Sequence, residues 1–223
     1  MVMRNLVIFG DTHFSERLYK YIEFEKVDHV VAFTQEKEFI RSDDLLGVPV
    51  IPFEDLDKKI SVDFSIIIGI GYSKMNSLRE YVYQLCKKKK YKIASYISTS
   101  AIVYTFAENL GEGTLVFPGT LIGPDCKLGT CNIIASSCVL SHDITFGNFN
   151  FISANVVFGG FAKVENNCFI GLNATIRDGI SIADKTMIGS ASNVLKTIDK
   201  IGCVLAGNPA RYLENKSSME TKV

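Results

Sequence analysis

The second half of the chain carries one large apolar residue at every sixth position. The residue after it is glycine in seven of fifteen cases, and the fourth residue after it is mostly small. A period of six with frequent glycine and no helical pattern is typical of a parallel β-helix built from hexapeptides. The fifteen apolar positions, without one insertion, are Leu110, Val116, Ile122, Leu128, Ile134, Leu140, Phe146, Ile152, Phe158, Val164, Ile170, Ile176, Ile182, Ile188 and Val194.

This period predicts the packing of the repeat. Each hexapeptide supplies a short strand and a corner, and three of them complete one coil of a triangular prism, so residues eighteen apart stack. We expect the apolar residue to point inward and the glycine to adopt backbone angles closed to other residues. Fifteen hexapeptides give about five coils, each stabilised by its neighbours. The small residues expected where the prism narrows are Thr114, Thr120, Cys126, Cys138, Ala162, Cys168, Ala174, Thr186 and Ser192.

Residues 1–96 show a different pattern, in which short apolar runs alternate with helical stripes. Strands are predicted at Leu6–Phe9, Val30–Phe33, 64–70 and 93–97, and helices around 14–22 and 78–85. This alternation favours right-handed βαβ units on a parallel sheet. Ligands of such sheets bind at the carboxyl ends of the strands. The residues placed at the mouth of that site are Gly10, Asp11, Thr12, Thr34 and Gly71.

The turn after the first strand has two interpretations. The run from Gly10 to Ser15 lacks the GxGxxG spacing of a dinucleotide site. A glycine followed by Thr12 and Ser15 can still present backbone amides to a phosphate at a helix start. The same residues also suit an ordinary turn in which threonine or serine caps the helix. The sequence leaves both open.

Composition and charge exclude several classes of protein. Lys+Arg and Asp+Glu both total 24, so net charge points neither to nucleic acid nor to an anionic membrane. Apolar runs such as Ser65–Ile68 are too short for a membrane span, and Met1–Arg4 leads into a strand without a signal-peptide core. The expected location is therefore the cytoplasm.

The six cysteines show no metal-binding spacing, so no metal site is predicted. Cys126, Cys138 and Cys168 occupy the small position of the repeat and are expected to be buried packing residues.

Two stretches carry a family resemblance. The repeat closes with Ala206-Gly207-Asn208-Pro209-Ala210, as in hexapeptide acyltransferases, and the run from Ser141 through Gly160 to Ala174 resembles the bacterial sialic acid O-acetyltransferase family. That family includes N-acetyltransferases of nucleotide-linked amino sugars. The resemblance implies a Rossmann-like α/β domain at 1–96 that binds the sugar nucleotide. It also implies a left-handed β-helix at 97–198, a C-terminal loop and tail at 199–223, and a homotrimer that uses acetyl-CoA in surface-glycan (lipopolysaccharide) synthesis. The polar tail at 216–223 is expected to be disordered.

His142 is the single histidine of the repeat, and it agrees with the family's catalytic histidine. Attack of an amine or alcohol on a thioester needs a base that is neutral near physiological pH, which imidazole provides. Asp143 would fix the imidazole tautomer. Neighbouring strand residues point to opposite faces, so that contact requires a corner conformation. Without it, an acid from elsewhere in the chain would take the role. The alternative interpretation of His142 is a solvated histidine without a catalytic role.

The eighteen-residue coil places Gly160 beside His142. A glycine there lets a thioester lie against the backbone, with a main-chain N–H for the carbonyl oxygen, as in the family. The resemblance further assigns the coenzyme to Phe161, Leu172 and Asp178, and its nucleotide end to Gly189, Ser190, Gly207, Asn208 and Pro209.

Three departures from the family concern the acceptor side. They are the reduced glycine motif at Gly10, the run Phe33-Thr34-Gln35 in place of an acidic pair, and Ala135 in place of an asparagine. They leave the acceptor sugar open.

The leading hypothesis is an acetyl-CoA-dependent N-acetyltransferase acting on a nucleotide-linked amino sugar. Attack is expected to be direct, because no serine or cysteine has a base at recognisable spacing. The nearest alternative acetylates a sugar hydroxyl at the same site, and another is a non-catalytic scaffold. A hexapeptide carbonic anhydrase needs more histidines than the repeat supplies.

Overall fold

The structure, a computed structural model, describes residues 3–221 and divides into two compact units. The first comprises the chain to Gly71 and Tyr81–Tyr96, and the second comprises Tyr72–Glu80 and the chain from Ile97 onward. The sequence places all of 1–96 in the first domain, whereas the segment Tyr72–Glu80 belongs to the second unit. No helix within residues 3–221 has the length and apolar character needed to cross a membrane.

The first unit contains a five-stranded sheet in the order β3-β4-β2-β1-β5. All neighbours are parallel except β3 and β4. The central strand β1 is buried along Leu6–Phe9, which agrees with its uninterrupted apolar run. The strands are β1 Asn5–Phe9, β2 His29–Gln35, β3 Asp44–Leu45, β4 Val48–Pro52 and β5 Ser65–Ile68, and the helices are α1 His13–Glu25, α2 Leu56–Lys59 and α3 Ser77–Lys88, with 3₁₀ turns at Lys37–Phe39 and Phe53–Asp55.

The sequence predicted β1, β2, β5, α1 and α3 but missed β4, because Pro49 and Pro52 obscure its pattern. The run 93–97 is also not one strand. Ile93 forms a single bridge with Ile66, and only Tyr96–Ile97 (β6) follows.

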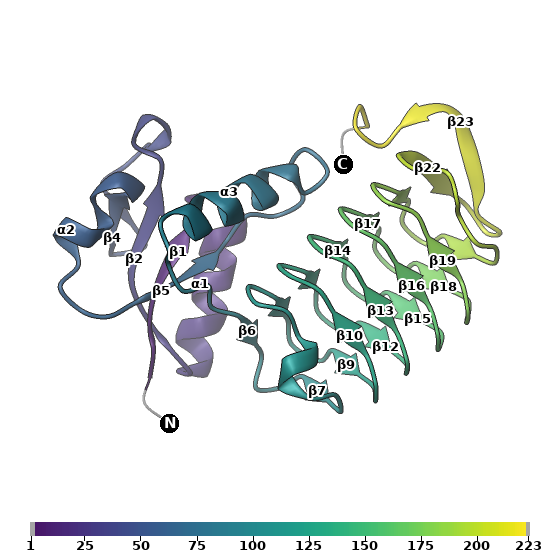
Figure 1. Cartoon of the computed structure of the whole chain (residues 1–223), viewed down its shortest axis with the longest axis horizontal. Helices are drawn as coiled ribbons and strands as arrows, with labels where there is room; N and C mark the ends of the chain where they lie inside the picture. Colours follow the sequence, from purple (N-terminus) through teal and green to yellow (C-terminus); the bar gives the residue numbers. More distant parts are fainter. Residues whose placement is uncertain (1–2, 222–223) are drawn as a thin grey trace. The chain divides into compact units, whose positions relative to one another are not determined.

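The second unit is a prism of stacked two-residue strands (Figure 1). Face 1 contains β8, β11, β14, β17, β20, β22 and β23; face 2 contains β7, β9, β12, β15, β18 and β21; face 3 contains β10, β13, β16 and β19. The strands are β7 Ile102–Val103, β8 Leu115–Val116, β9 Leu121–Ile122, β10 Lys127–Leu128, β11 Ile133–Ile134, β12 Val139–Leu140, β13 Thr145–Phe146, β14 Phe151–Ile152, β15 Val157–Phe158, β16 Lys163–Val164, β17 Phe169–Ile170, β18 Thr175–Ile176, β19 Ser181–Ile182, β20 Met187–Ile188, β21 Asn193–Val194, β22 Cys203–Ala206 and β23 Arg211–Ser217, with a 3₁₀ turn at Ala107–Asn109.

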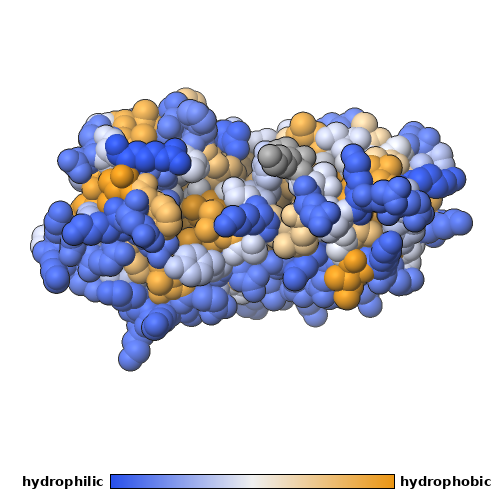
Figure 2. Space-filling model, turned by 90° about the horizontal axis from the view of Figure 1, so that it is seen from above, coloured by the Kyte–Doolittle hydropathy of each residue, from blue (hydrophilic) through white to orange (hydrophobic). Residues whose placement is uncertain are grey.

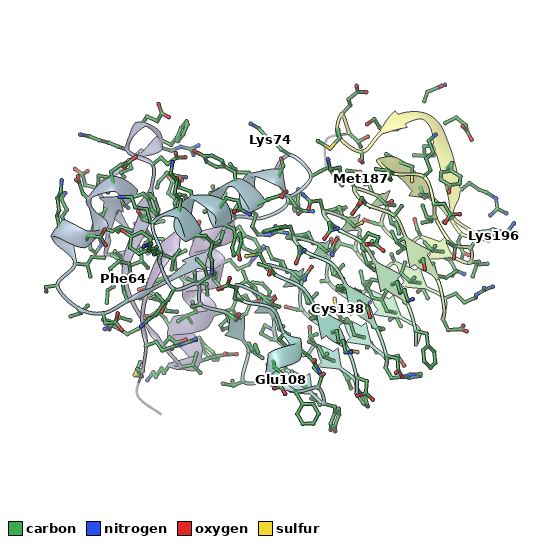
Figure 3. All side chains as sticks on the ribbon, viewed as in Figure 1. Phe64, Lys74, Glu108, Cys138, Met187 and Lys196 are labelled. Atoms are coloured by element: carbon green, nitrogen blue, oxygen red, sulfur yellow. The ribbon has the colours of Figure 1, made fainter. Side chains whose placement is uncertain are left out.

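Strand pairing confirms the eighteen-residue coil. Val139 pairs with Val157, and Thr145 pairs with Lys163. Every recurrent apolar residue from Val116 to Val194 is at most 4% exposed, and the small residues four positions later are buried as well. Cys138, labelled in Figure 3, is one of these buried residues.

The glycines at the position after each apolar residue have a different role from the one predicted. The left-handed backbone occurs two residues after each of these positions. Gly113 and Asp125 are examples, and the conformation recurs at every sixth residue as far as Ala191. A Cβ on Gly111 would lie 2.5 Å from the Gly129 carbonyl carbon, and one on Gly129 would lie 2.6 Å from the Gly147 oxygen. These glycines therefore permit close approach of successive coils.

The C-terminal segment is ordered structure and not the predicted loop and tail. Strand β22 extends face 1 through the pairing of Met187 with Val204, and β23 runs antiparallel to it. Ser218, inside the tail expected to be disordered, is fully buried. Residues 222 and 223 of that tail lie outside the described residues.

The segment Tyr72–Glu80 is held on face 1 by a buried arginine. Arg79 is 1% exposed, and its guanidinium donates to the carbonyl oxygens of Cys131 (3.0 Å), Phe149 (2.7 Å) and Asn150 (3.1 Å). Burial lowers the pKa of Arg79 to about 10, so the group stays protonated at neutral pH. The Asn76 amide adds a bond to the Cys168 oxygen at 3.0 Å.

Replacing Arg79 by methionine is expected to lower the free energy of unfolding by about 3 kcal/mol or more, because several buried carbonyls lose their donor. The matched control is Lys74→Met, an exposed cation of the same segment, for which a change within about 0.5 kcal/mol is expected. Urea unfolding followed by circular dichroism measures both. Equal stability of the two variants would contradict the anchoring role of Arg79.

Candidate active site

His142 and Asp143 lie at the corner between β12 on face 2 and β13 on face 3, called here the His142 corner. Asp143 adopts the left-handed conformation (φ +53°), and its Oδ2 lies 2.9 Å from His142 Nδ1. The corner conformation that this contact requires is therefore present. With the carboxylate as acceptor, Nδ1 carries the proton and Nε2 keeps a lone pair. The two side chains are 47% and 44% exposed, so a ligand can reach them.

Gly160 stacks one coil beyond His142, as the eighteen-residue spacing predicted. A Cβ at Gly160 would lie 2.6 Å from His142 Nε2, so any side chain at this position requires the imidazole to move. The Gly160 carbonyl accepts from the Gly179 N–H at 2.9 Å, whereas the Gly160 N–H has no acceptor among residues 3–221. Gly160 is itself buried, and buried amides seldom lack a partner. An acceptor atom of a ligand suits this amide.

The corner between faces 3 and 1 shows that this fold can satisfy the equivalent amide internally. There the Asn148 side chain accepts from Thr130 N–H (2.8 Å), Asn166 from Asn148 N–H (2.8 Å), and Asp184 from Asn166 N–H (2.7 Å). Each side chain caps the amide one coil before it. Across the described chain, no such bond joins Asp178 to the amide of Gly160. At the His142 corner the uncapped amide of Gly160 lies beside an imidazole, a combination that the corner between faces 3 and 1 does not offer.

Phe161 completes the surroundings of the imidazole. Its ring centroid lies 5.1 Å from that of His142, with the two planes at 89°. Its backbone has φ +61°, and 59% of the residue is exposed. Phe161, which the resemblance assigns to the coenzyme, thus also contacts the His142 imidazole.

The other predicted coenzyme residues lie along two different corners. Asp178 follows Gly160 on the His142 corner. Leu172, Gly189 and Ser190 lie at the corner between faces 1 and 2, where Ala191 N–H donates to the Leu172 oxygen at 2.7 Å. A single chain therefore does not bring these three residues to His142.

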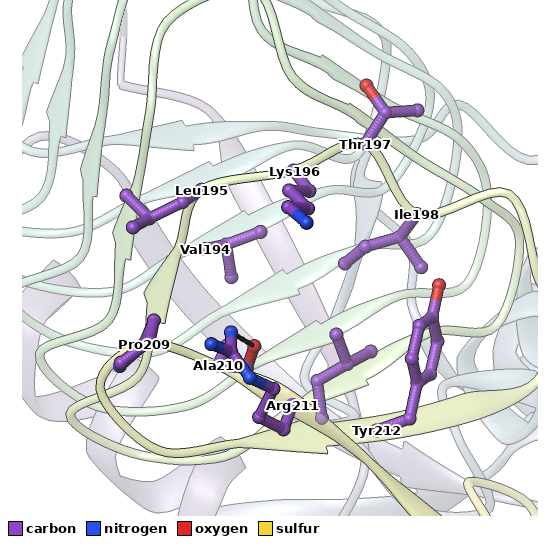
Figure 4. A pocket seen from close by; sticks show the side chains of 10 residues that line it. Val194, Leu195, Lys196, Thr197, Ile198, Pro209, Ala210, Arg211 and Tyr212 are labelled. Atoms are coloured by element: carbon purple, nitrogen blue, oxygen red, sulfur yellow. Dashed lines mark hydrogen bonds between the residues drawn. The ribbon is translucent and has the colours of Figure 1, made fainter.

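A cavity of about 410 Å³ lies at the C-terminal end of the prism, between Val194–Ile198 and Pro209–Tyr212 (Figure 4). Lys196, Arg211 and Tyr212 line it together with Pro209, the one predicted coenzyme residue among its walls. The loop before it is fixed by Asn193, whose N–H donates to the Gly207 oxygen (3.0 Å) and whose side chain donates to Asn208 (3.2 Å). The cavity combines two cationic side chains with an aromatic ring.

Sequence reasoning missed Lys196, Arg211 and Tyr212. Lys196 had a usable signal, because it continues the series 142, 160 and 178 by another eighteen residues. Arg211 and Tyr212 had none, since their segment was interpreted as a loop.

The predicted mouth of the first unit is largely closed by its own hydrogen bonds. Gly10 N–H donates to the Thr34 oxygen, and Thr12 N–H donates to Ser15 Oγ, both at 2.8 Å. Thr12 is the N-cap of α1, which favours the capping interpretation of this turn over an amide cradle for phosphate. Thr34 is fully buried, and its hydroxyl donates to the Ile51 oxygen at 2.7 Å. Its side chain is therefore not available for the substrate contact predicted from the sequence. Asp11 remains partly exposed after the carboxyl end of β1, and Gly71 lies beside Phe14.

Cysteine chemistry does not contribute a nucleophile here. All six cysteines are buried and none is in a disulfide. Burial raises the pKa of Cys138 to about 11 and that of Cys168 to about 12, so both thiols stay protonated at neutral pH. The part of the chain that the structure describes has no group of three or more histidine, cysteine or acidic side chains suited to a metal ion.

Comparison with known proteins identifies the fold. Residues 162–190 match the model of the hexapeptide repeat of succinyl-transferase. The acetyltransferase domain of PglB from Neisseria gonorrhoeae has a TM-score of 0.81 at 19% identity, covering 94% of this chain and 100% of that one. PerB from Caulobacter crescentus, in complex with CoA and GDP-perosamine, has a TM-score of 0.82 at 23% identity, covering 93% and 96%. WeeI from Acinetobacter baumannii has a TM-score of 0.72 at 20% identity, covering 95% and 100%. The chain thus has the fold of the hexapeptide-repeat acyltransferases.

Proposed function

We propose that the chain is an acetyl-CoA-dependent N-acetyltransferase acting on a nucleotide-linked amino sugar. The observation that carries this proposal is the His142–Asp143 pair beside the uncapped amide of Gly160. A base with a free Nε2 and an unpaired N–H within one corner is the arrangement that acyl transfer needs.

The chemistry follows from these atoms. The acceptor amine attacks the thioester carbonyl carbon while His142 Nε2 takes its proton, and the Gly160 N–H donates to the oxygen as it becomes negative. The carbon–sulfur bond then breaks, coenzyme A leaves, and the imidazolium returns the proton to its sulfur. Asp143 stabilises the imidazolium between these steps. The products are the acetylated amine and free coenzyme A.

The structural neighbours support this choice of substrates. The gonococcal acetyltransferase domain has been solved with acetyl coenzyme A, and the Caulobacter protein, described as a perosamine N-acetyltransferase, with CoA and GDP-perosamine. For this chain we propose a place in surface-glycan (lipopolysaccharide) synthesis in the cytoplasm. The first unit, as a Rossmann-like domain, would hold the nucleotide near Asp11 and Thr12.

We place the coenzyme along the His142 corner, from Gly160 and Phe161 past Asp178 to the cavity at Lys196. Three coils separate His142 from Lys196, which at about 4.8 Å per coil is roughly 15 Å. Lys196 and Arg211 would then face the phosphates of the nucleotide end, near the loop Gly207-Asn208-Pro209. In the homotrimer of left-handed prisms that we propose, a second copy brings Leu172, Gly189 and Ser190 to the other side of the coenzyme.

Loss of both cations in this cavity should weaken coenzyme binding selectively. For Lys196→Ala/Arg211→Ala we expect KM for acetyl-CoA to rise about tenfold or more with kcat little changed, because contacts remote from the reacting carbon contribute uniform binding. Lys163→Ala, an exposed cation of face 3, is the matched control. Steady-state kinetics at two salt concentrations measure the effect, and an unchanged KM would remove the coenzyme from this cavity.

The activity itself is tested with the purified full chain, acetyl-CoA and a panel of UDP-, dTDP- and GDP-linked amino and hydroxy sugars. We expect thiol release with an amino sugar and a product whose new acetyl group resists hydroxylamine. A product that loses acetyl to hydroxylamine is an ester and would establish O-acetylation at the same site. No thiol release with any sugar, together with no heat stabilisation by coenzyme A, would overturn the proposal in favour of a non-catalytic scaffold.

A further inference from the structure

We infer that Phe161 is a positioning residue that holds the His142 imidazole in its reactive orientation. This inference rests on the proposed role of His142 as the base. Three groups surround the ring: Asp143 Oδ2 at Nδ1, the Gly160 backbone near Nε2, and the perpendicular ring of Phe161. Asp143 fixes one atom of the imidazole, whereas Phe161 fixes the plane in which the ring lies.

The fold does not require a phenylalanine at residue 161. The same step of the repeat has a left-handed backbone in successive hexapeptides, where it is held by Asn155, Asn167, Asn173 and Gly179 among others. Large side chains are disfavoured in that conformation, and asparagine and glycine are favoured. Phe161 is 59% exposed, unlike Phe149 at the same step, which is buried. Packing of the prism therefore does not explain Phe161, and its contact with His142 does.

A second restraint on the imidazole is needed because the first one is accessible to water. His142 and Asp143 are each nearly half exposed, so water competes for the bond at Nδ1. An aromatic ring packed against the imidazole removes water from one side and limits rotation of the histidine side chain. Nε2 then stays directed at the space beside Gly160, where the acceptor amine must lose its proton.

Phe161→Asn is the direct test, because asparagine is the residue that this chain already uses at equivalent corners. We expect an unchanged or higher melting temperature and a fall in kcat of about tenfold, larger than any rise in KM for acetyl-CoA from the lost coenzyme contact. Phe161→Tyr, which keeps the ring, should retain kcat. A rise in KM for acetyl-CoA with kcat unchanged would instead make Phe161 a coenzyme contact only and overturn the inference.

Nitrogen NMR of the imidazole provides a readout that does not depend on turnover. The chain has three histidines, so the His142 signals are assigned by their loss in His142→Gln. In wild type we expect neutral His142 to be protonated at Nδ1. In Phe161→Asn we expect nitrogen shifts averaged between the two tautomers, because an imidazole that rotates away from Asp143 loses the bond that selects the Nδ1–H form. The control is Lys185→Asn, at the same step of another corner, which should match wild type. An unaveraged Nδ1–H form in Phe161→Asn would contradict the inference, whether or not the sugar substrate has been found.

Discussion

Replacing His142 by asparagine should lower kcat by about 10²–10⁴, because the base that accepts the amine proton is lost. The side chain is half exposed, and within residues 3–221 its one side-chain hydrogen bond is to Asp143, so its loss leaves no buried cavity and the coils remain intact. Affinity for acetyl-CoA should therefore persist. Steady-state kinetics measure the first expectation, and calorimetric titration with coenzyme A measures the second.

The control is His13→Asn, a fully exposed histidine at the start of α1. We expect it to match wild type in both measurements. If His142→Asn kept turnover within about threefold of wild type, general-base catalysis by this residue would be excluded, since such catalysis contributes at least about 10².

Periodicity was sufficient to predict the repeat because each coil is specified locally. Every hexapeptide carries its own inward residue, and the spacing of eighteen alone placed Gly160 beside His142. The alternation of side chains along a strand also predicted that His142 and Asp143 can touch only at a corner of the prism. The left-handed backbone of Asp143 forms that corner. In contrast, the reason for the glycines was predicted wrongly. Contact between coils, which one hexapeptide does not reveal, determines where a Cβ is excluded.

Features that depend on distant pairing could not be predicted in this way. Arg79 is buried by carbonyls 52 to 71 residues away, although its own helix has an ordinary amphipathic pattern. Strand β23 is mostly exposed and polar, so only its pairing with β22 reveals it as a wall of the Lys196 cavity. Figure 2 shows hydrophilic residues over most of the visible face, with smaller hydrophobic areas between them. Composition alone therefore does not locate these features.

Replacing Gly160 by alanine should lower kcat/KM by about 10²-fold, because displacing a catalytic group by about 1 Å can have an effect of this size. The added Cβ would lie 2.6 Å from His142 Nε2, so the imidazole must move. The fold itself tolerates alanine at this step, since Ala154 occupies the equivalent position of the neighbouring hexapeptide. The melting temperature should therefore change little, and the backbone N–H remains present.

A double-mutant cycle assigns the loss to the imidazole. In a His142→Ala background the space above residue 160 is empty, so Gly160→Ala should cost far less there than in wild type. The coupling between the two sites should approach about 2 kcal/mol, since a factor of ten corresponds to 1.4 kcal/mol. Additive effects of the two replacements would mean that the alanine methyl group obstructs the thioester and leaves the base in place. Retention of wild-type kcat/KM in Gly160→Ala would show that the reaction does not take place at this corner.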